Sequence, residues 1–456
     1  MINTEISDKL PSIQLVWNQE WKTVEVGGQN AEIPSEWTIA HLSQISTLHG
    51  GIPAPKEFSS KGRPFIRVSN LHHQGWLVGA DQTREFLAKD AGYKSVPEGT
   101  LLVAKSGESI HQKYRNITST ECVIVGHVAG IEANEDHNIH YLRHHLKNKP
   151  FEKILAQGGA TPSISMKDLG GVHVFSMPLP EQTLIAQVLT AQESQVHDLR
   201  KLAQAERQRL AWLSEELLSG RLRVEEDPTA ESVVVSRNEK GEPAEVLPGV
   251  RVVENLGWKT VEANGRKTKL PKEWRMEALE SITECLDSHR VPLSQKDRLN
   301  RKGNTPYWGA NNIVDYVDGH LLEGKFILLG EDAAPFFDKT KKVSFVVEGK
   351  IWPNNHIHVL NTKESHDFLC FQLNRFDYST VLNTVERPKL TQSGMKSMSI
   401  PLAPRAEQTL IAQVLTAQET QALEIERLAD LEQQRLEWLS EELLSGRIRA
   451  KTTKED

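Results

Sequence analysis

The sequence predicts a mixed α/β (α+β) protein with two globular α/β domains, two long antiparallel coiled-coil helices and a pseudo-two-fold internal repeat. Three observations predict this fold: a duplicated set of phrases, an apolar period of about 3.5 residues in two of the duplicated segments, and little likeness between the segments enclosed by the repeats. With 456 residues, the chain also exceeds the length at which a single hydrophobic core stops growing, so at least two domains are expected.

Two sets of repeated phrases define the duplication. Trp21–Glu25 (WKTVE) recurs as Trp258–Glu262. The phrase EQTLIAQVLTAQE starts at Glu181 and again at Glu407, and WLSEELLSGR recurs with the same spacing, at Trp212 and Trp438, near the end of each copy. Each half of the chain is therefore predicted to consist of a lead-in, a globular segment and a long helix.

The repeated helical segments carry the apolar period of a coiled coil. Alternating steps of four and three residues from Ile185 and from Ile411 reach an apolar residue at most positions. The predicted seam consists of Ile185, Leu189, Leu199, Leu210, Leu213 and Leu217 in the first copy, and of Ile411, Leu415, Ile425, Leu436, Leu439 and Leu443 in the second.

Polar residues and glycines occur at matching places in both predicted helices. Gln192 and Glu206 interrupt the first seam, and Gln418 and Glu432 interrupt the second. A polar seam residue lowers stability but fixes the register of the helices. Both copies end in Ser-Gly-Arg, with a glycine where a helix C-terminus favours one. These features favour two helices that pack on each other; helices that pack only on their own domains are the alternative.

The repeats give the domain boundaries. In chain order they are an N-terminal lead-in (1–37), domain 1 (38–178), the first long helix (179–223), a charged linker rich in turn residues (224–257), domain 2 with its lead-in (258–400), the second long helix (401–450) and a tail (451–456). The linker is expected to be irregular.

Composition is typical of a globular protein, and we expect a cytoplasmic one. The N-terminus lacks the apolar region of a signal peptide, and no run of about 18 apolar residues occurs. The three cysteines, Cys122, Cys285 and Cys370, are far apart in the sequence. This spacing fits a reducing compartment and argues against a disulfide framework or a thiolate zinc site.

Motifs of catalysis and cofactor binding are missing from the sequence. It has no G-x-x-x-x-G-K-[ST] phosphate loop, no G-x-S-x-G nucleophile motif and neither of the two motifs of a methyltransferase. His137, His140, His144 and His145 are close in sequence, but no cysteine or acidic residue has the spacing of metal ligands, so we expect them to be neutral polar surface residues. The chain is therefore predicted to be non-catalytic, with no cofactor and no metal of its own.

Phrases in both globular segments resemble the specificity subunit of type I restriction-modification systems. The phrases are Gly50–Pro53 (GGIP), Pro64–Leu71 (PFIRVSNL) and Gly99–Gly107 (GTLLVAKSG) in domain 1, and Tyr307–Tyr316 (YWGANNIVDY) and Leu328–Ala334 (LLGEDAA) in domain 2. The duplicated helix phrases add to the resemblance, which covers nearly the whole chain. The second helix begins with PLAPRAEQ where the first has PLPEQ, so a different lead-in is expected there.

The resemblance implies a DNA-binding subunit of a phage-defence complex. Each globular domain is expected to be a target-recognition domain that reads one half of a bipartite site on double-stranded DNA. The implied partners are two modification (methyltransferase) subunits, which bring S-adenosylmethionine, and restriction (translocase/endonuclease) subunits, which bring ATP and Mg²⁺. Because the net charge of the chain is −7, we expect a partner to supply part of the basic surface that phosphate binding requires.

The candidate DNA-binding residues are basic, amide, hydroxyl and aromatic side chains near turns. Arginine and glutamine can each make two hydrogen bonds to a base edge, although half or more of protein–DNA hydrogen bonds go to the backbone. The candidates are Arg67, Ser69, Asn70, Lys105, Ser106, His111, Gln112, Lys113, Tyr114 and Arg115 in domain 1, and Arg298, Arg301, Lys302, Tyr307, Asn311, Asn312, Arg387 and Lys389 in domain 2.

Two alternatives accompany this interpretation. The chain could be a duplicated coiled-coil scaffold that presents two protein-binding modules, or a self-sufficient modification enzyme, although the missing motifs argue against the latter. Trp212 and Trp438, near the ends of the helices, are either docking points for partners or caps of the helix core.

Overall fold

A computed structural model describes most of the chain, in two compact units. The described residues are 10, 13–26, 28–72, 75–88, 92–112, 114–147, 163–227, 234–237, 243–245, 249–263, 265–332, 334–338, 340–382 and 388–452. Unit 1 comprises Met1–Lys201 and Glu426–Asp456, and unit 2 comprises Leu202–Ile425. Each unit contains one globular domain, the start of one long helix and the end of the other. No helix in the described part of the chain is long and apolar enough to span a membrane.

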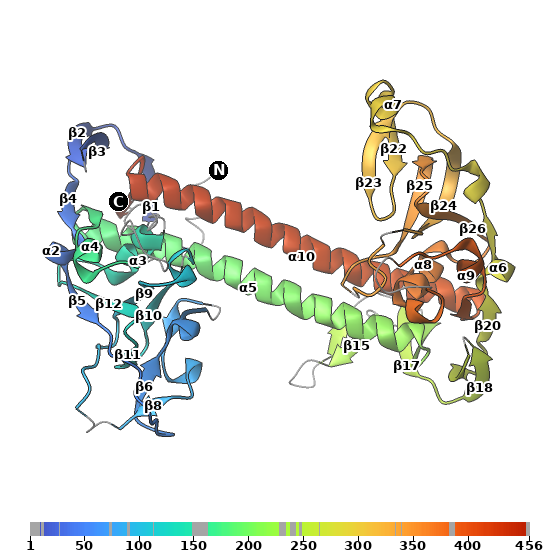
Figure 1. Ribbon diagram of the computed structural model, residues 1–456, viewed down its shortest axis with the longest axis horizontal. Helices are drawn as coiled ribbons and strands as arrows, with labels where there is room; N and C mark the ends of the chain where they lie inside the picture. Colours follow the sequence, from blue (N-terminus) through green and yellow to red (C-terminus); the bar gives the residue numbers. More distant parts are fainter. Residues whose placement is uncertain are drawn as a thin grey trace. The chain divides into compact units, whose positions relative to one another are not determined.

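Unit 1 is built around a five-stranded sheet (Figure 1), with strand order β5-β12-β9-β10-β7 and antiparallel pairing except between β10 and β7. Its strands are β5 (Ser46–Gly50), β12 (Val128–Ala133), β9 (Leu101–Ala104), β10 (Arg115–Thr118) and β7 (Leu77–Val78). A second sheet contains β11 (Val123–Ile124), β6 (Arg63–Ile66) and β8 (Phe86–Leu87). The pairs are β1 (Ile13–Trp17) with β28 (Ile448–Thr452), β2 (Trp21–Val26) with β3 (Gln29–Pro34), and β4 (Thr38–His41) with β13 (His173–Ser176). The short helices are α2 (Leu42–Ile45), α3 (Ile139–Lys147) and α4 (Met166–Gly170), with 3-10 turns η1 (Val68–His72), η2 (Ala80–Gln82) and η3 (Glu108–Ile110).

Unit 2 is built around a six-stranded sheet with strand order β21-β26-β24-β25-β22-β23, in which only β22 and β25 pair parallel. Its strands are β21 (Thr283–Cys285), β26 (Ile357–Thr362), β24 (Leu322–Gly330), β25 (Ser344–Pro353), β22 (Lys302–Trp308) and β23 (Ile313–Val317). The pairs are β14 (Leu222–Glu226) with β17 (Val250–Glu254), β15 (Val234–Arg237) with β16 (Pro243–Glu245), β18 (Trp258–Ala263) with β19 (Arg266–Pro271), and β20 (Arg275–Ala278) with β27 (Ser399–Leu402). The short helices are α6 (Leu279–Ile282), α7 (Gln295–Leu299), α8 (His366–Arg375) and α9 (Gln392–Lys396), with 3-10 turns η5 (Asp287–His289) and η6 (Tyr378–Thr380).

The two long helices pack antiparallel within each unit, which confirms the predicted fold class (Figure 1). α5 spans Leu179–Leu218 and α10 spans Arg405–Ser445. Most seam residues lie in the cores: Ile185, Leu189, Leu436, Leu439 and Leu443 in unit 1, and Leu213, Leu217, Ile411 and Leu415 in unit 2, whereas Leu199, Leu210 and Ile425 are half-buried.

The four polar seam residues form two matching layers. In unit 1, the side-chain amide of Gln192 donates to Glu432, and in unit 2 that of Gln418 donates to Glu206 at 2.6 Å. Glutamine in one copy thus meets glutamate in the other copy. A shift of register would bury these groups without partners, so the layers fix the alignment of the helices within each unit.

Each long helix begins at a buried carboxylate with the same partners in both units. In unit 1, Glu181 accepts a hydrogen bond from Trp37 Nε1 at 3.2 Å and pairs with Arg449, whose Nη2 also donates to Glu36 at 2.8 Å. Trp37 is fully buried, so this cluster attaches the lead-in and β28, which carries Arg449, to the start of α5. The counterparts in unit 2 are Glu407, Trp274, Arg223 and Glu273, with the same contacts.

The glutamine after each of these carboxylates attaches the helix to its domain. Gln182 donates to Met177 O at 2.8 Å and accepts from Asn138 N at 2.9 Å, just before α3. Gln408 donates to Ala403 O at 2.9 Å and accepts from Ser365 N at 3.0 Å, just before α8. Both side chains are fully buried with partners, which explains why the Glu-Gln pair recurs in the duplication.

The structure corrects the prediction of an irregular linker over residues 224–257. β14 and β17 pair antiparallel over the whole length of both strands, and a further pair, β15 with β16, lies between them in the chain. Val224 and Val250 are buried, whereas Glu225 and Glu226 are exposed. Of the charged residues that suggested a loop, Glu225 and Glu226 therefore lie on a strand with one buried face. β1 and β28 pair in the same way in unit 1.

The helices are also shorter than the predicted ranges 179–223 and 401–450. Gly220 and Gly446 adopt positive φ angles of 72° and 78°, and a Cβ atom at either position would overlap the ring of Pro271 or Pro34. A residue with positive φ ends a helix, and the chain then turns into β14 or β28. At its start, α10 is shortened because β27 continues through Leu402.

Candidate nucleic-acid interface

In domain 1, Arg67 and Asn70 are engaged by the domain itself. The guanidinium of Arg67 pairs with Glu85 through two hydrogen bonds and lies over the rings of Phe58 and Phe65. The side chain of Asn70 accepts from Arg67 N at 2.6 Å and orders the turn η1. Ser69, between them, is exposed. The turn thus presents Ser69 on a rigid support, while the charge of Arg67 is already balanced.

In the segment His111–Arg115, the sequence prediction needs correction for Arg115, which is buried. His111 and Gln112 are exposed, and Lys113 lies outside the described residues. Tyr114 packs against the core that includes Phe65. Arg115 is only 4% exposed and donates to Tyr114 O at 2.8 Å, because its position on β10 directs it inward. Only His111 and Gln112 of this segment are therefore described at the surface.

In domain 2, the candidates on α7 and β22 surround Asp315 of β23. Lys302 Nζ lies 2.7 Å from the Asp315 carboxylate, and Arg298 Nε lies 3.3 Å from it. The hydrogen bond from Lys302 is the main cause that lowers the pKa of Asp315. Arg301 is exposed and stacks over Trp352 at 4.8 Å. This group presents cations, with Asp315 balancing part of their charge.

Tyr307 is a further correction. It is 2% exposed, and its hydroxyl accepts from Leu293 N at 2.9 Å, so it is a core residue of the sheet. Asn311 and Asn312 lie at the turn between β22 and β23, where Asn312 O accepts from Gly309 N at 2.9 Å. Asn312 is exposed at this turn. Arg387 lies outside the described residues.

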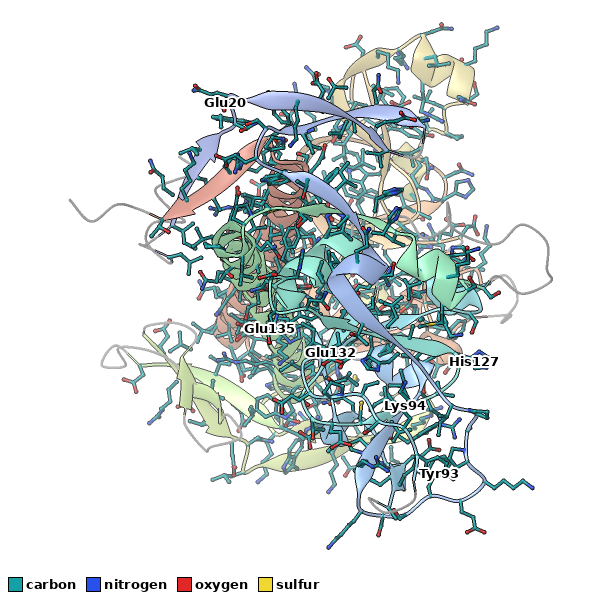
Figure 2. The ribbon with its side chains drawn as sticks, turned by 90° about the vertical axis from the view of Figure 1, so that its left-hand side faces the viewer. Glu20, Tyr93, Lys94, His127, Glu132 and Glu135 are labelled. Carbon is teal, nitrogen blue, oxygen red and sulfur yellow. The ribbon has the colours of Figure 1, made fainter. Side chains whose placement is uncertain are left out.

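Lys105 and Ser106 lie at a junction of three segments at the end of β9. Lys105 N donates to His127 O at 3.0 Å, and Lys105 O accepts from Ile164 N at 2.8 Å. Ser106 forms a β-bridge with Ser163, and its hydroxyl lies 2.6 Å from His127 Nδ1. His127, which sequence reasoning missed, is exposed at the margin of unit 1 (Figure 2).

Lys389 lies at the equivalent junction of domain 2, at the end of β24. Glu331 N donates to His356 O at 2.9 Å, and Glu331 O accepts from Leu390 N at 2.9 Å. Asp332 forms a β-bridge with Lys389 and pairs with its ammonium group at 3.2 Å and with His356 Nδ1 at 3.0 Å. Burial acts to raise the pKa of Asp332, but hydrogen bonds from His356 and Lys389 hold this pKa below its usual value.

A buried charge network lies beneath this second junction. Asp287, Glu331 and His358 are 9%, 8% and 1% exposed, and one ligand-type atom of each lies within 4.8 Å of the others. His358 Nδ1 is 2.6 Å from Asp287 and its Nε2 is 2.8 Å from Leu390 O, so both ring nitrogens face acceptors. Arg290 Nη1 lies 2.6 Å from Glu331. The charges thus compensate each other, and the cluster is organised as ion pairs.

Burial acts to raise the pKa of Asp287, but hydrogen bonding to His358 and the charge of that ring outweigh it, so the pKa is lowered. The network therefore keeps the carboxylate of Asp287 ionised. It also holds the segment of Lys389 against β26, because His358 bonds to Leu390 O.

The four histidines near α3 divide into two pairs, and the expectation that they are surface residues is wrong for His144 and His145. Both are buried, with His145 packed against the rings of Tyr141 and Phe175, and burial lowers the pKa of His144 to about 3. His144 Nε2 lies 3.0 Å from the Thr190 hydroxyl. His137 and His140 are half-buried. Their proximity in sequence reflects the packing of one helix.

α3 also carries a buried ion pair that sequence reasoning missed. Arg143 donates to both carboxylate oxygens of Glu193 on α5, at 2.6 and 2.9 Å, and Lys147 lies 2.7 Å from the same carboxylate. Burial acts to raise the pKa of Glu193, but Arg143 and Lys147 lower it to about 2. This contact attaches domain 1 to its helix.

Comparisons with known proteins identify a family and a solved structure that this chain resembles. The family model described as the type I restriction modification DNA specificity domain matches residues 34–207 and 271–433, more than half of the chain and both halves of the duplication. A crystal structure of a type I restriction-modification system S subunit from M. genitalium aligns with a TM-score of 0.57 and 12% identity, over 92% of this chain and 98% of that one. At this identity the likeness concerns the fold.

Two curated relatives match parts of the chain. A Haemophilus influenzae protein named as the putative type I restriction enzyme specificity subunit S.HindORF215P is 37% identical over 147 residues, or 32% of this chain and 37% of the relative. The Methanocaldococcus jannaschii type I restriction enzyme MjaIX specificity subunit is 27% identical over 208 residues, or 43% of this chain and 46% of the relative. The chain thus spans less than half the length of either relative.

Proposed function

The chain belongs to the type I restriction-modification DNA specificity family, and from this premise we propose that it is the DNA sequence-recognition subunit of such a complex. In this proposal, each domain reads one half of a bipartite target. The chain itself is non-catalytic and directs the adenine methyltransferase and restriction subunits to the site.

One observation carries the proposal: two dissimilar domains are attached in the same way to duplicated helices. The clusters around Glu181 and Glu407 have matching contacts, and so do the two polar layers of the helices. Contacts to base edges must differ between two half-sites, whereas attachment and spacing need not. A constant scaffold with variable domains is what two-part recognition requires.

Apolar residues on the long helices support docking of partner subunits there. On the unit 1 part of α10, Leu428 and Leu431 are 38% and 46% exposed and lie about one turn apart. On the unit 2 part of α5, Leu202 and Trp212 are each 45% exposed. Trp438, by contrast, is partly buried against the unit 1 core, as the capping alternative expects. Exposed Leu and Trp side chains on a helix suit protein contacts.

The cofactors are assigned to the partners. S-adenosylmethionine belongs to two modification subunits, and ATP with Mg²⁺ belongs to the restriction subunits. The net charge of −7 agrees with a subunit that binds DNA together with more basic partners.

The test is single-molecule sequencing of adenine methylation in cells that express the modification subunit with and without this chain. A bipartite motif that depends on the chain is the expected result. If an active methyltransferase gives the same pattern in both cases, the scaffold with two protein-binding modules replaces this proposal. Methylation by the purified chain alone would instead indicate a self-sufficient enzyme.

A further inference from the structure

Both domains contain the same backbone junction at the end of a central strand. We use the name strand-end junction for a set of four residues in each domain. The set is Lys105, Ser106, His127 and Ser163 in domain 1, and Glu331, Asp332, His356 and Lys389 in domain 2. Three backbone contacts match between the domains. The amide of the first residue after the strand donates to the carbonyl of the histidine, at 3.0 Å in domain 1 and 2.9 Å in domain 2. The carbonyl of that same residue accepts from the amide of a later segment, at 2.8 and 2.9 Å, and each domain has one β-bridge to that segment. In each domain the histidine Nδ1 also meets the side chain that follows the strand end, at 2.6 Å and 3.0 Å.

The match is not a consequence of similar sequence, because the domains share little sequence between the repeated phrases. The spacing along the chain from Ser106 to Asp332 equals that from Ser163 to Lys389, and both equal the spacing of the repeated helices. His127 and His356 are separated by nearly the same length of chain. The duplication thus preserved the backbone frame and the histidine while the other side chains diverged.

The exposed chemistry of the two junctions differs. Domain 1 presents His127 and Ser163, both exposed, beside the hydroxyl of Ser106. Domain 2 presents a carboxylate, Asp332, whose side chain is 30% exposed, with His356 at 49%. A carboxylate only accepts hydrogen bonds at neutral pH and so selects a base that carries an amino group, as with cytosine N4. A hydroxyl and an imidazole can also donate to acceptor edges.

The residues buried beneath the two junctions also differ, because only those of domain 2 form a charge network among the described residues. In domain 2, Asp287, Glu331 and His358 are buried together with Arg290. In the strand pairings and the junction of domain 1, the corresponding described positions are Gly50, Lys105 and Ala129, which carry no carboxylate or imidazole, so this cluster has no counterpart there. Burying charges is costly, and such networks concentrate where side chains must be held in place for function.

We propose that the strand-end junction is a base-reading position in each domain, with His127 and Ser106 reading one half-site and Asp332 and His356 reading the other. The inference rests on the proposed DNA-reading function and assigns the reading to particular side chains. Asp332 then selects a base whose edge carries an amino group, with cytosine N4 as the usual partner of a carboxylate.

The experiment uses the full chain with its modification subunit and single-molecule methylation sequencing. His127→Ala and Ser106→Ala are expected to relax one base pair in one half of the motif, and Asp332→Asn and His356→Ala one base pair in the other half. Discrimination at that base pair should fall roughly tenfold to a hundredfold, the range for loss of one good base contact. Glu135→Ala in domain 1 and His320→Ala in domain 2 change exposed residues outside the junctions and should leave the motif intact.

The outcomes separate the two proposals. A wild-type complex without a bipartite motif contradicts the proposed function itself. A wild-type bipartite motif that every junction variant keeps, even with slower methylation throughout, overturns the junction as a reader, since uniform slowing indicates a backbone contact or a loss of stability. Asp332→Asn keeps one acceptor oxygen, so Asp332→Ala is tested beside it, and a folded, assembled Asp332→Ala variant with an unchanged motif contradicts the assignment of Asp332.

Discussion

The two domains bury their charges in different places. Domain 1 buries an ion pair, Arg143 with Glu193, where α3 meets α5. In domain 2, α8 packs through apolar residues such as Phe368 and Leu373, and its ion pair with α5, Arg375 with Glu215, is half-exposed. Lys342 pairs with Glu419 of α10, and the lysine is half-exposed. Domain 2 instead buries charge beneath its strand-end junction. A fixed backbone frame therefore tolerates buried charge at either place, provided that each charge has partners.

The largest expected effect breaks the domain 1 attachment. Arg143→Met leaves Glu193 buried with Lys147 alone, and should lower the free energy of unfolding of domain 1 by about 3 kcal/mol. Hydrogen exchange of α3 and β10 amides under denaturant would measure it. The control is Lys342→Met in domain 2, whose half-exposed pair should contribute less than about 1 kcal/mol. Equal losses for both variants would contradict the difference between the domains.

A smaller effect concerns acid. The folded pKa of His144 is about 3, below the ordinary value near 6.5, so the unfolded state binds the proton first. The stability from this group is complete above pH 6.5 and is lost as the pH falls toward 3, at about 1.4 kcal/mol per pH unit. Between pH 6.5 and pH 5, domain 1 should lose about 2 kcal/mol.

Amide exchange in domain 1 as a function of pH checks this dependence. His144→Gln should flatten the profile between pH 6.5 and pH 5, whereas His320→Gln, at an exposed histidine of domain 2, should leave it unchanged. An unaltered slope in His144→Gln would show that another group carries the acid sensitivity.

The smallest expected effect concerns the polar layers of the long helices, which both units share. Gln192→Leu with Glu432→Leu replaces one polar layer by apolar packing, and should change the stability of unit 1 by no more than about 1 kcal/mol. Gln418→Leu with Glu206→Leu should give the same change in unit 2. Thermal unfolding of both double variants provides the measurement. Clearly different values would mean that the layers are matched in geometry but not in energy.

Sequence reasoning located part of the candidate interface. Turns and charge in the sequence predict Lys105, Ser106 and Lys389, and all three lie at the strand-end junctions. They do not predict His127 and His356, because strand pairing brings these residues to the junction from another part of the chain. The available signal was the constant spacing of the duplicated helices, which also relates Ser106 to Asp332. Turns and charge also predict Arg115 and Tyr307, although both point into the domains.

By itself, the sequence determined the duplication, the two long helices and their polar interruptions. These features follow from periodicity and local identity, which depend on neighbours along the chain. Only the tertiary structure decided which polar residues pair across the helices, that the expected linker forms strands, and which charged side chains are buried. Those outcomes depend on contacts between distant segments, and burial and partners set the energy of a charge far more strongly than its residue type does.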